Sequence, residues 1–266
     1  MKNRLSAAVL AGLTLTALLF ACQKDDRNSQ GKAKLEIRLT DAPASYDAVY
    51  VDIQKVMVHA STDAETENGW VELPLLHPGI YNLLDFRNGL DTVLADTEVP
   101  AGEINQVRLV LGNRNSVVID GVEHELKTPS AQQSGLKVKF RTVLEAGIVY
   151  RLYLDFDASR SVVTAGNSGQ YILKPVIRGY SDAIGGSIKG IVLPPAALTQ
   201  VWAIQNTDTL LALPDIATGH YFFGGLPAGA WKLVYDAQVP PYRDTTVTVN
   251  VATGVVTNVE TIQITQ

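Results

Sequence analysis

Apolar and polar residues alternate in short stretches along almost the whole chain after residue 34. In residues 35–39, 107–111 and 152–156 every second residue is apolar. A period of two places neighbouring side chains on opposite faces of a strand, so each stretch predicts a β-strand with one buried face. Turn-forming residues separate the stretches about every ten residues, which is typical of antiparallel β-sandwiches. The chain is therefore predicted to be all-β. The weakest strand prediction is 82–87, where a helical turn is the alternative.

Two local patterns add detail to the predicted strands. The apolar parity changes between Ile53 and Val56, which predicts a bulge near Gln54-Lys55. Asp120-Gly121 separates two strand-like stretches, and both residue types tolerate positive φ, so this pair predicts a tight hairpin.

A pair of glycines divides the chain. Gly185 and Gly186 lie in a segment, 183–187, that we interpret as a hinge between a domain at 34–182 and a second domain at 187–266. The second domain is predicted to form two packed sheets, with strands at 188–192, 199–205, 209–213, 220–223, 230–235, 245–251 and 258–264.

The first 22 residues have the parts of a secretory signal. Lys2 and Arg4 form a basic start, residues 7–20 are almost entirely apolar, and a small residue precedes Cys22. The apolar stretch is shorter than the roughly 20 residues that a membrane-spanning helix needs. A plain membrane anchor is the alternative that this length disfavours. Residues 1–21 are therefore predicted to be a signal peptide, and residues 22–33 the lipid attachment site and a polar tether.

Residues 19–22, Leu-Phe-Ala-Cys, resemble the lipobox of bacterial lipoproteins. The resemblance implies that Cys22, the only Cys in the chain, receives lipid and holds the protein on a membrane. The next residues, Gln23, Lys24, Asp25 and Asp26, resemble the export signal of Bacteroidetes-type surface lipoproteins. That resemblance implies a location in the outer membrane, facing the cell exterior. A solvated polar tether is the alternative interpretation of these four residues.

Charge excludes one class of partner. Without Lys2 and Arg4, 20 basic residues remain against 27 acidic ones, a net charge of −7. The charges are scattered, so the chain lacks the basic surface that nucleic-acid binding requires.

Three motifs in the second domain match a known pattern. They are Gly190-Ile191-Val192, residues 219–223 and residues 226–233, in which Pro227 and Gly229 shape a tight turn. On these residues the domain resembles carboxypeptidase regulatory-like domains, which are small prealbumin-type sandwiches. Gly224-Gly225 departs from the pattern by lengthening the turn.

The first domain has its own set of motifs. Residues 39–43, Leu-Thr-Asp-Ala-Pro, are followed by an alternating strand, by Pro100-Ala101-Gly102 and by residues 154–162. On these residues the domain resembles an uncharacterised family of bacterial lipoprotein domains, a domain of unknown function. The resemblance implies a β-sandwich and no chemistry.

The sequence contains few candidate catalytic or metal-binding residues. The four histidines lack metal-site spacing, there is no nucleophile elbow and no phosphate loop. Asp155 and Asp157 share one strand face and could hold calcium or act as an acid–base pair. We favour the simpler interpretation, in which Asp157 caps a turn and Asp155 faces solvent. No cofactor, metal or catalytic residue is predicted, and the protein is expected not to be an enzyme.

Aromatic residues offer candidate ligand contacts. Trp202 lies on the opposite strand face from Val201 and Ala203, and whether it faces the core or solvent is open. Trp202 and Tyr242 are the candidate ligand contacts, whereas the simpler interpretation, which we favour for each Trp, is a core position. We expect a non-catalytic envelope lipoprotein that binds or adheres to a glycan or a protein. The alternatives are a structural or accessory subunit of a cell-surface assembly and, less favoured, a hydrolase with an unrecognised site.

Overall fold

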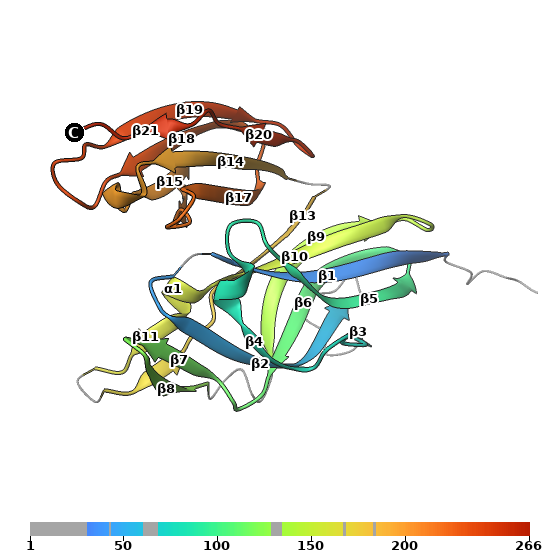
Figure 1. Cartoon of the computed structure of the whole chain (residues 1–266). Coiled ribbons are helices and arrows are strands. Elements are labelled where there is room, and N and C mark those ends of the chain that lie inside the picture. Colours follow the sequence, from blue (N-terminus) through green and yellow to red (C-terminus); the bar gives the residue numbers. More distant parts are fainter. Residues whose placement is uncertain (1–30, 43, 61–68, 129–134, 167–168, 183–184) are drawn as a thin grey trace, which may run out of the picture.

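The structure is a computed structural model that describes residues 31–42, 44–60, 69–128, 135–166, 169–182 and 185–266. Its strands form two β-sandwiches, and the second lies across one sheet of the first (Figure 1). The all-β prediction is confirmed. The predicted lipidation and export residues, Cys22 to Asp26, lie outside the described residues.

The first sandwich has thirteen described strands. They are β1 (Lys32–Ala42), β2 (Ala48–His59), β3 (Trp70–Leu73), β4 (Gly79–Asn82), β5 (Thr92–Pro100), β6 (Gly102–Leu111), β7 (Ser116–Ile119), β8 (Val122–Lys127), β9 (Leu136–Leu144), β10 (Val149–Asp157), β11 (Val162–Thr164), β12 (Tyr171–Leu173) and β13 (Ile177–Ser181). One sheet has the order β13-β10-β1-β5, and the other has the order β11-β12-β8-β7-β2-β6-β9, with β3 and β4 also paired to β2. Most pairs are antiparallel, whereas β1 runs parallel to β10.

The second sandwich has eight described strands. They are β14 (Gly186–Leu193), β15 (Gln200–Gln205), β16 (Asp208–Ala212), β17 (His220–Leu226), β18 (Gly229–Asp236), β19 (Thr245–Val251), β20 (Val256–Asn258) and β21 (Ile262–Gln263). One sheet has the order β17-β14-β20 with β21 on β14, and the other has the order β16-β15-β18-β19. Three short helices complete the described part of the chain: η1 (Leu83–Phe86), α1 (Ala158–Ser161) and η2 (Pro195–Ala197).

Several local predictions are confirmed. The register of β2 against β6 shifts between Ile53 and Lys55, where the bulge was predicted. Asp120 and Gly121 both have positive φ in the turn from β7 to β8. The alternative for 82–87 is correct, because residues 83–86 form η1, with Asn82 accepting a hydrogen bond from the Leu84 amide.

Two stretches with strand-like sequences are each divided between two strands. Residues 171–177 are divided between β12 and the start of β13, which belong to different sheets because the chain crosses from one layer to the other between them. Residues 258–264 divide into the end of β20 and β21, which pair with different parts of β14. The first strand begins at Lys32, and Ala33 is already fully buried.

Each sandwich has its own hydrophobic core. Alternation along β1 and β10 produces the first core, since Leu35, Ile37 and Leu154 are fully buried while their polar neighbours are not. The second core contains Tyr221, Trp231 and Leu233. Gly186, half of the predicted hinge, is a buried residue of β14. The described part of the chain contains no helix with the length and apolar character to span a membrane.

Candidate functional site

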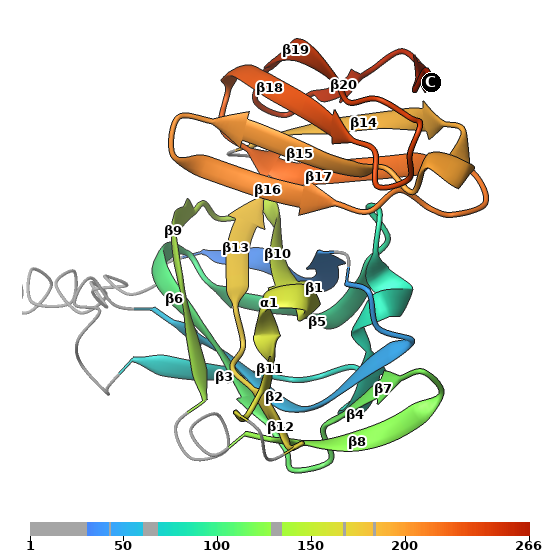
Figure 2. The same ribbon diagram turned by 90° about the vertical axis from the view of Figure 1, so that its left-hand side faces the viewer.

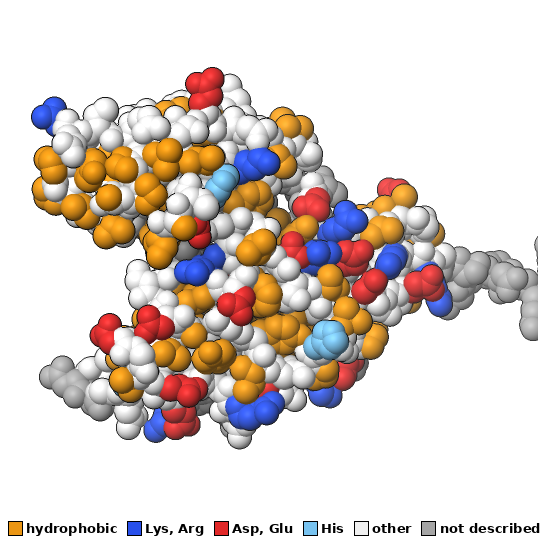
Figure 3. All heavy atoms as spheres, in the orientation of Figure 1, with side chains coloured by type: hydrophobic (Ala, Val, Ile, Leu, Met, Phe, Trp, Pro, Cys, Tyr) orange, Lys and Arg blue, Asp and Glu red, His pale blue; other side chains and the backbone are white. Residues whose placement is uncertain are grey.

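A cleft of about 250 Å³ lies where the two sandwiches meet. Its floor comes from the ends of β1, β10 and β13, from α1 and from the loop after η1, and its roof comes from β15, β16 and β17 (Figure 2). The space-filling view shows the surface hollowed between the two sandwiches (Figure 3). The floor includes Thr40, Asp41, Asn88, Asp155, Asp157, Ser159, Arg160 and Arg178, and the roof includes Trp202, Thr209, Leu210, Leu211, Phe222 and Gly224.

Arg178 joins the floor to the roof. It lies opposite Asp155 in the β10–β13 pair, and its Nη2 is 2.8 Å from Asp155 Oδ2. The same nitrogen donates to the Gly224 carbonyl oxygen at 2.8 Å, and Nη1 donates to the Gly225 carbonyl oxygen at 3.2 Å. One guanidinium therefore binds a carboxylate of the first sandwich and two backbone carbonyls of the second.

Aromatic rings pack closely at the same junction. Gly225 has a φ of +63°, and a side chain there would overlap the ring of Tyr180, with a Cβ only 2.2 Å from Cγ. Tyr180 stacks on Tyr153 with ring centroids 4.9 Å apart. On the other side of the cleft, the Phe222 ring lies against Gly89. The two glycines that depart from the regulatory-like pattern, Gly224 and Gly225, are thus among the residues that contact the first sandwich.

Trp202 and Tyr242 lie in different places. Trp202 is partly exposed and lines the roof of the cleft, because β15 directs Val201 and Ala203 into the core and Trp202 outward. Tyr242 packs against the second core in the loop between β18 and β19. The structure therefore does not bring these two predicted residues together. Of the other tryptophans, Trp231 is buried and Trp70 stacks edge-on against His59.

The predicted roles of Asp155 and Asp157 are half correct. Asp157 caps α1, since its Oδ1 accepts from the Arg160 amide at 2.9 Å and from Ser159 Oγ at 2.7 Å. The prediction that Asp155 faces solvent is wrong, because Arg178 from β13 covers it and its side chain is only 15% exposed. Within the described ranges there is no group of three or more His, Cys, Asp or Glu side chains that could hold a metal ion.

Asp41 is the carboxyl group with the most unusual environment in the cleft. It is 5% exposed, its Oδ1 accepts from the Ala158 amide at 3.1 Å, and its Oδ2 has no hydrogen-bond partner among the described residues. Burial, together with the charges of Asp155 and Asp157, raises its pKa to about 9. Asp41 is therefore neutral at pH 7. Because Oδ2 is shielded from solvent, a ligand in the cleft does not reach it directly.

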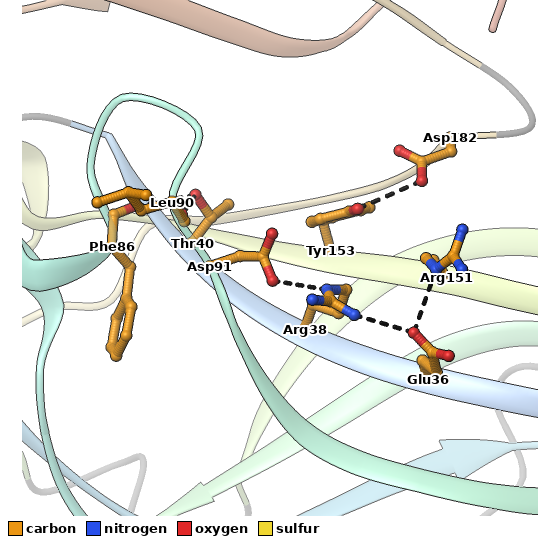
Figure 4. Close-up of polar contacts among 9 residues, drawn as sticks. All are labelled: Glu36, Arg38, Thr40, Phe86, Leu90, Asp91, Arg151, Tyr153 and Asp182. Carbon is orange, nitrogen blue, oxygen red and sulfur yellow. Dashed lines mark hydrogen bonds and ion pairs between the residues drawn. The ribbon is translucent and has the colours of Figure 1, made fainter.

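A row of polar side chains continues from the cleft along the outer face of the β13-β10-β1-β5 sheet (Figure 4). Arg38 lies between Asp91, at 2.6 Å, and Glu36, at 2.9 Å, and Arg151 donates to the same Glu36 oxygen at 3.2 Å. Tyr153 donates to Asp182 at 3.2 Å, and burial and the nearby carboxylates raise the pKa of Tyr153 to about 12. The charges of Glu36, Arg38, Asp91 and Arg151 are thus paired with one another.

The cleft is consequently amphipathic and nearly neutral in charge. Asp155 is paired with Arg178, Asp157 lies 3.8 Å from Arg160, and Asp41 is protonated. Aromatic and aliphatic side chains face these polar groups from the roof. Such a site can hold an uncharged ligand with one apolar face and several hydroxyl groups.

Sequence reasoning found Trp202, Asp155 and Asp157 but missed Arg178 and Asn88. Arg178 lies near the start of β13 and Asn88 in the loop after η1, and no local sequence pattern shows that the second sandwich covers them. The one sequence feature that could have indicated the contact between the two sandwiches is Gly224-Gly225. Consecutive glycines permit close approach by another part of the chain.

A family model, Domain of unknown function (DUF4382), matches residues 32–175, which is more than half of the chain. The chain belongs to this family. The DUF4382 domain contains every floor residue from Thr40 to Arg160, whereas Arg178, Tyr180 and the whole roof follow the matched residues. The cleft therefore lies between the DUF4382 domain and a second sandwich that the family model does not include.

No curated protein matches the chain. Among solved structures, the Bacillus anthracis TIE protein matches 89% of this chain, which covers 35% of that protein, at 10% identity and a TM-score of 0.26. GBS52, the minor pilin of Streptococcus agalactiae, matches 88% of this chain over 95% of its own, at 10% identity and a TM-score of 0.23. The shaft pilin SpaA of Lactobacillus rhamnosus GG matches 88% of this chain over 96% of its own, at 6% identity and a TM-score of 0.24.

Proposed function

We propose that this DUF4382 protein is a non-catalytic envelope lipoprotein that binds a glycan in the cleft between its two sandwiches. The observation that carries the proposal is the position of Trp202, partly exposed in the roof and opposite a polar floor. A sugar ring has the same two-sided chemistry, since its C–H face packs on an aromatic ring while its hydroxyls form hydrogen bonds.

The roof supports this ligand class through its apolar surface. Leu210, Leu211 and Phe222 lie beside Trp202 along the cleft, and Thr209 adds an exposed hydroxyl. The ring face of a saccharide would displace water from this apolar surface, and no charged group would be desolvated.

The floor supports it through accessible hydrogen-bonding groups. The guanidinium of Arg160 is exposed, that of Arg178 is partly exposed, and the Ser159 hydroxyl lies beside them. Because the acidic and basic groups of the floor already pair with one another, a neutral sugar matches the cleft better than a phosphate or a uronic acid.

The anchoring part of the proposal comes from the N-terminal motif. Lipid on Cys22 would hold the domains at a membrane, and the residues after it, Gln23 to Asp26, would direct the protein to the outer face of the outer membrane. The resemblance of the second sandwich to carboxypeptidase regulatory-like domains belongs to the same proposal. A surface position would give the cleft access to external or cell-wall glycans.

The binding test compares two single variants of the chain from Gln23 to Gln266. A glycan array identifies the ligand, and calorimetry then measures its affinity for wild type, Trp202→Ala and Tyr242→Ala. We expect Trp202→Ala to weaken binding about tenfold or more, the loss of roughly one aromatic contact. Tyr242→Ala, outside the cleft, should bind as wild type does. Equal binding by wild type and Trp202→Ala would place the ligand elsewhere.

The anchoring test uses the full chain in cells. Cys22→Ser should remove incorporation of labelled fatty acid and leave an uncleaved precursor, because the thiol is the attachment point. A Cys22→Ser protein that still takes up label would overturn the lipoprotein part of the proposal and leave the glycan part standing.

A further inference from the structure

Most edge strands of the two sandwiches carry features that prevent pairing with another chain. The edge strand β5 has Asp96, Glu98 and Pro100, its register against β1 shifts, and a bridge from Leu75 to Ala95 partly covers it. The edge strand β9 alternates basic residues along its exposed face, and its register against β6 also shifts. Charges, proline and bulges are the usual means by which proteins block edge pairing.

Other edges are covered or short. Strand β17 presents Gly224 and Gly225 to Tyr180 and Arg178, and β16 lines the cleft toward the first sandwich. Strands β11 and β20 have three residues each. None of these edges offers a long free ladder to a partner.

Strand β19 differs from all of them. Its seven residues, Thr-Thr-Val-Thr-Val-Asn-Val, pair with β18 along their whole length without a register shift, and they include no charge and no proline. On the other side, the described residues supply one hydrogen bond, from Thr257 Oγ1 to the Asn250 carbonyl oxygen at 3.2 Å. This carbonyl therefore points away from β18, and the alternate residues Thr246 and Thr248 point their backbone groups the same way.

We propose that β19 pairs with β19 of a second copy of this chain, so that two sandwiches share one continuous eight-stranded sheet. An antiparallel pair of identical strands brings no like charges together in any register, because β19 has none. Uncharged Thr and Asn side chains on one face and half-buried Val side chains on the other would lie beside their own kind.

The position of β19 permits this pairing and limits it to two copies. In both ribbon views β19 lies on the side of the second sandwich away from the first, so the first sandwiches of two copies stay apart (Figures 1 and 2). The opposite edge of the same sheet is β16, which faces the cleft. The sheet therefore cannot continue into a fibre, and pairing closes as a two-fold dimer.

The first measurement is the mass of the chain from Gln23 to Gln266 by light scattering over a concentration series. We expect twice the monomer mass for wild type and the monomer mass for the double variant Thr246→Lys/Thr248→Lys. Both threonines are exposed, so the fold should persist, which circular dichroism checks. Thr207→Lys, in the β15–β16 turn, is the matched control and should remain a dimer.

The second measurement locates the contact. The chain from Gln23 onward has no cysteine, so Thr248→Cys introduces a single thiol near the proposed axis. Mild oxidation should join two copies of Thr248→Cys by a disulfide, whereas Thr207→Cys should stay uncrosslinked. A wild type that is monomeric at every concentration, a dimer that survives the two lysines, or equal crosslinking of both cysteine variants would overturn the proposal. If β19 instead pairs with a strand of another protein, the isolated wild type should be monomeric at every concentration, which is the first of these results.

Discussion

The first sandwich has an aliphatic interior and many ion pairs on its surface, whereas the second has an aromatic interior and none. Among the described residues, the buried hydrophobic side chains of the first core include only two aromatic ones, Phe140 and Phe156. The second core is much smaller, yet it buries Tyr221, Phe223, Trp231 and Tyr235. Every ion pair between described residues involves the first sandwich alone.

The difference shows how each sandwich obtains its stability. A large core distributes the burial of apolar surface over many side chains, so the loss of one leaves most of it intact. A small core depends on a few large rings, and three of them are fixed by polar contacts. Trp231 Nε1 donates to the Pro227 carbonyl oxygen at 2.9 Å, and the Tyr221 and Tyr235 hydroxyls are 2.6 Å apart. The second sandwich should therefore be more sensitive to single truncations, and the first to changes of pH.

The largest effect is expected for Trp231→Ala. Trp231 is 1% exposed and belongs to the second core, and emptying a large aromatic site costs about 3–5 kcal/mol. That loss approaches the whole stability of a small domain. Hydrogen exchange measured by mass spectrometry should show lost protection in β14 to β19, while β1 to β10 retain theirs.

Two controls sharpen this prediction. Phe156→Ala makes a comparable truncation in the first core and should reduce protection there without abolishing it. Trp202→Ala removes the same side chain from a partly exposed position and should change protection little. Equal loss of protection in both sandwiches after Trp231→Ala would mean that the two unfold as one unit, contrary to the predicted boundary near residue 185.

The sequence predicted most strands of both sandwiches because alternation directly reports which face is buried. Tyr221 and Trp231 are buried by the same alternation, on the core faces of β17 and β18. The sequence did not predict the cleft, because Arg178, Asp155 and Gly224 meet through contacts between separate sheets that no local pattern encodes. The burial of Asp41 arises only when α1 packs over the end of β1, which no local pattern shows.

Asp41 and Asp52 form a second contrast within the first sandwich. Both are buried carboxyl groups, at 5% and 2% exposure. Burial alone would raise the pKa of Asp52, but hydrogen bonds from Arg114 and Gln54 outweigh it and lower the pKa. Asp41 has no such partner, and its pKa rises to about 9. The two groups therefore affect stability with opposite sign and in different ranges of pH.

Asp41→Asn should make the first sandwich more stable at neutral pH. The unfolded chain ionises Asp41 above about pH 4, whereas the folded protein keeps it protonated until about pH 9. The free energy of unfolding of wild type should therefore fall as the pH rises between these values, by up to about 4 kcal/mol at pH 7. Asn can still accept from the Ala158 amide and does not ionise, so urea unfolding of the variant should lack this slope.

Asp52→Asn provides the matched control because it makes the same substitution at a buried but paired carboxylate. A lowered pKa stabilises the fold above about pH 4 and loses that contribution as the pH falls through the folded-state pKa. The variant should therefore be less stable than wild type at pH 7, and the difference should shrink in acid. Parallel pH profiles for Asp41→Asn and wild type between pH 4 and 9 would show that Asp41 is ionised in the fold. The cleft would then carry a net negative charge, and a cationic ligand would fit it better than a neutral sugar.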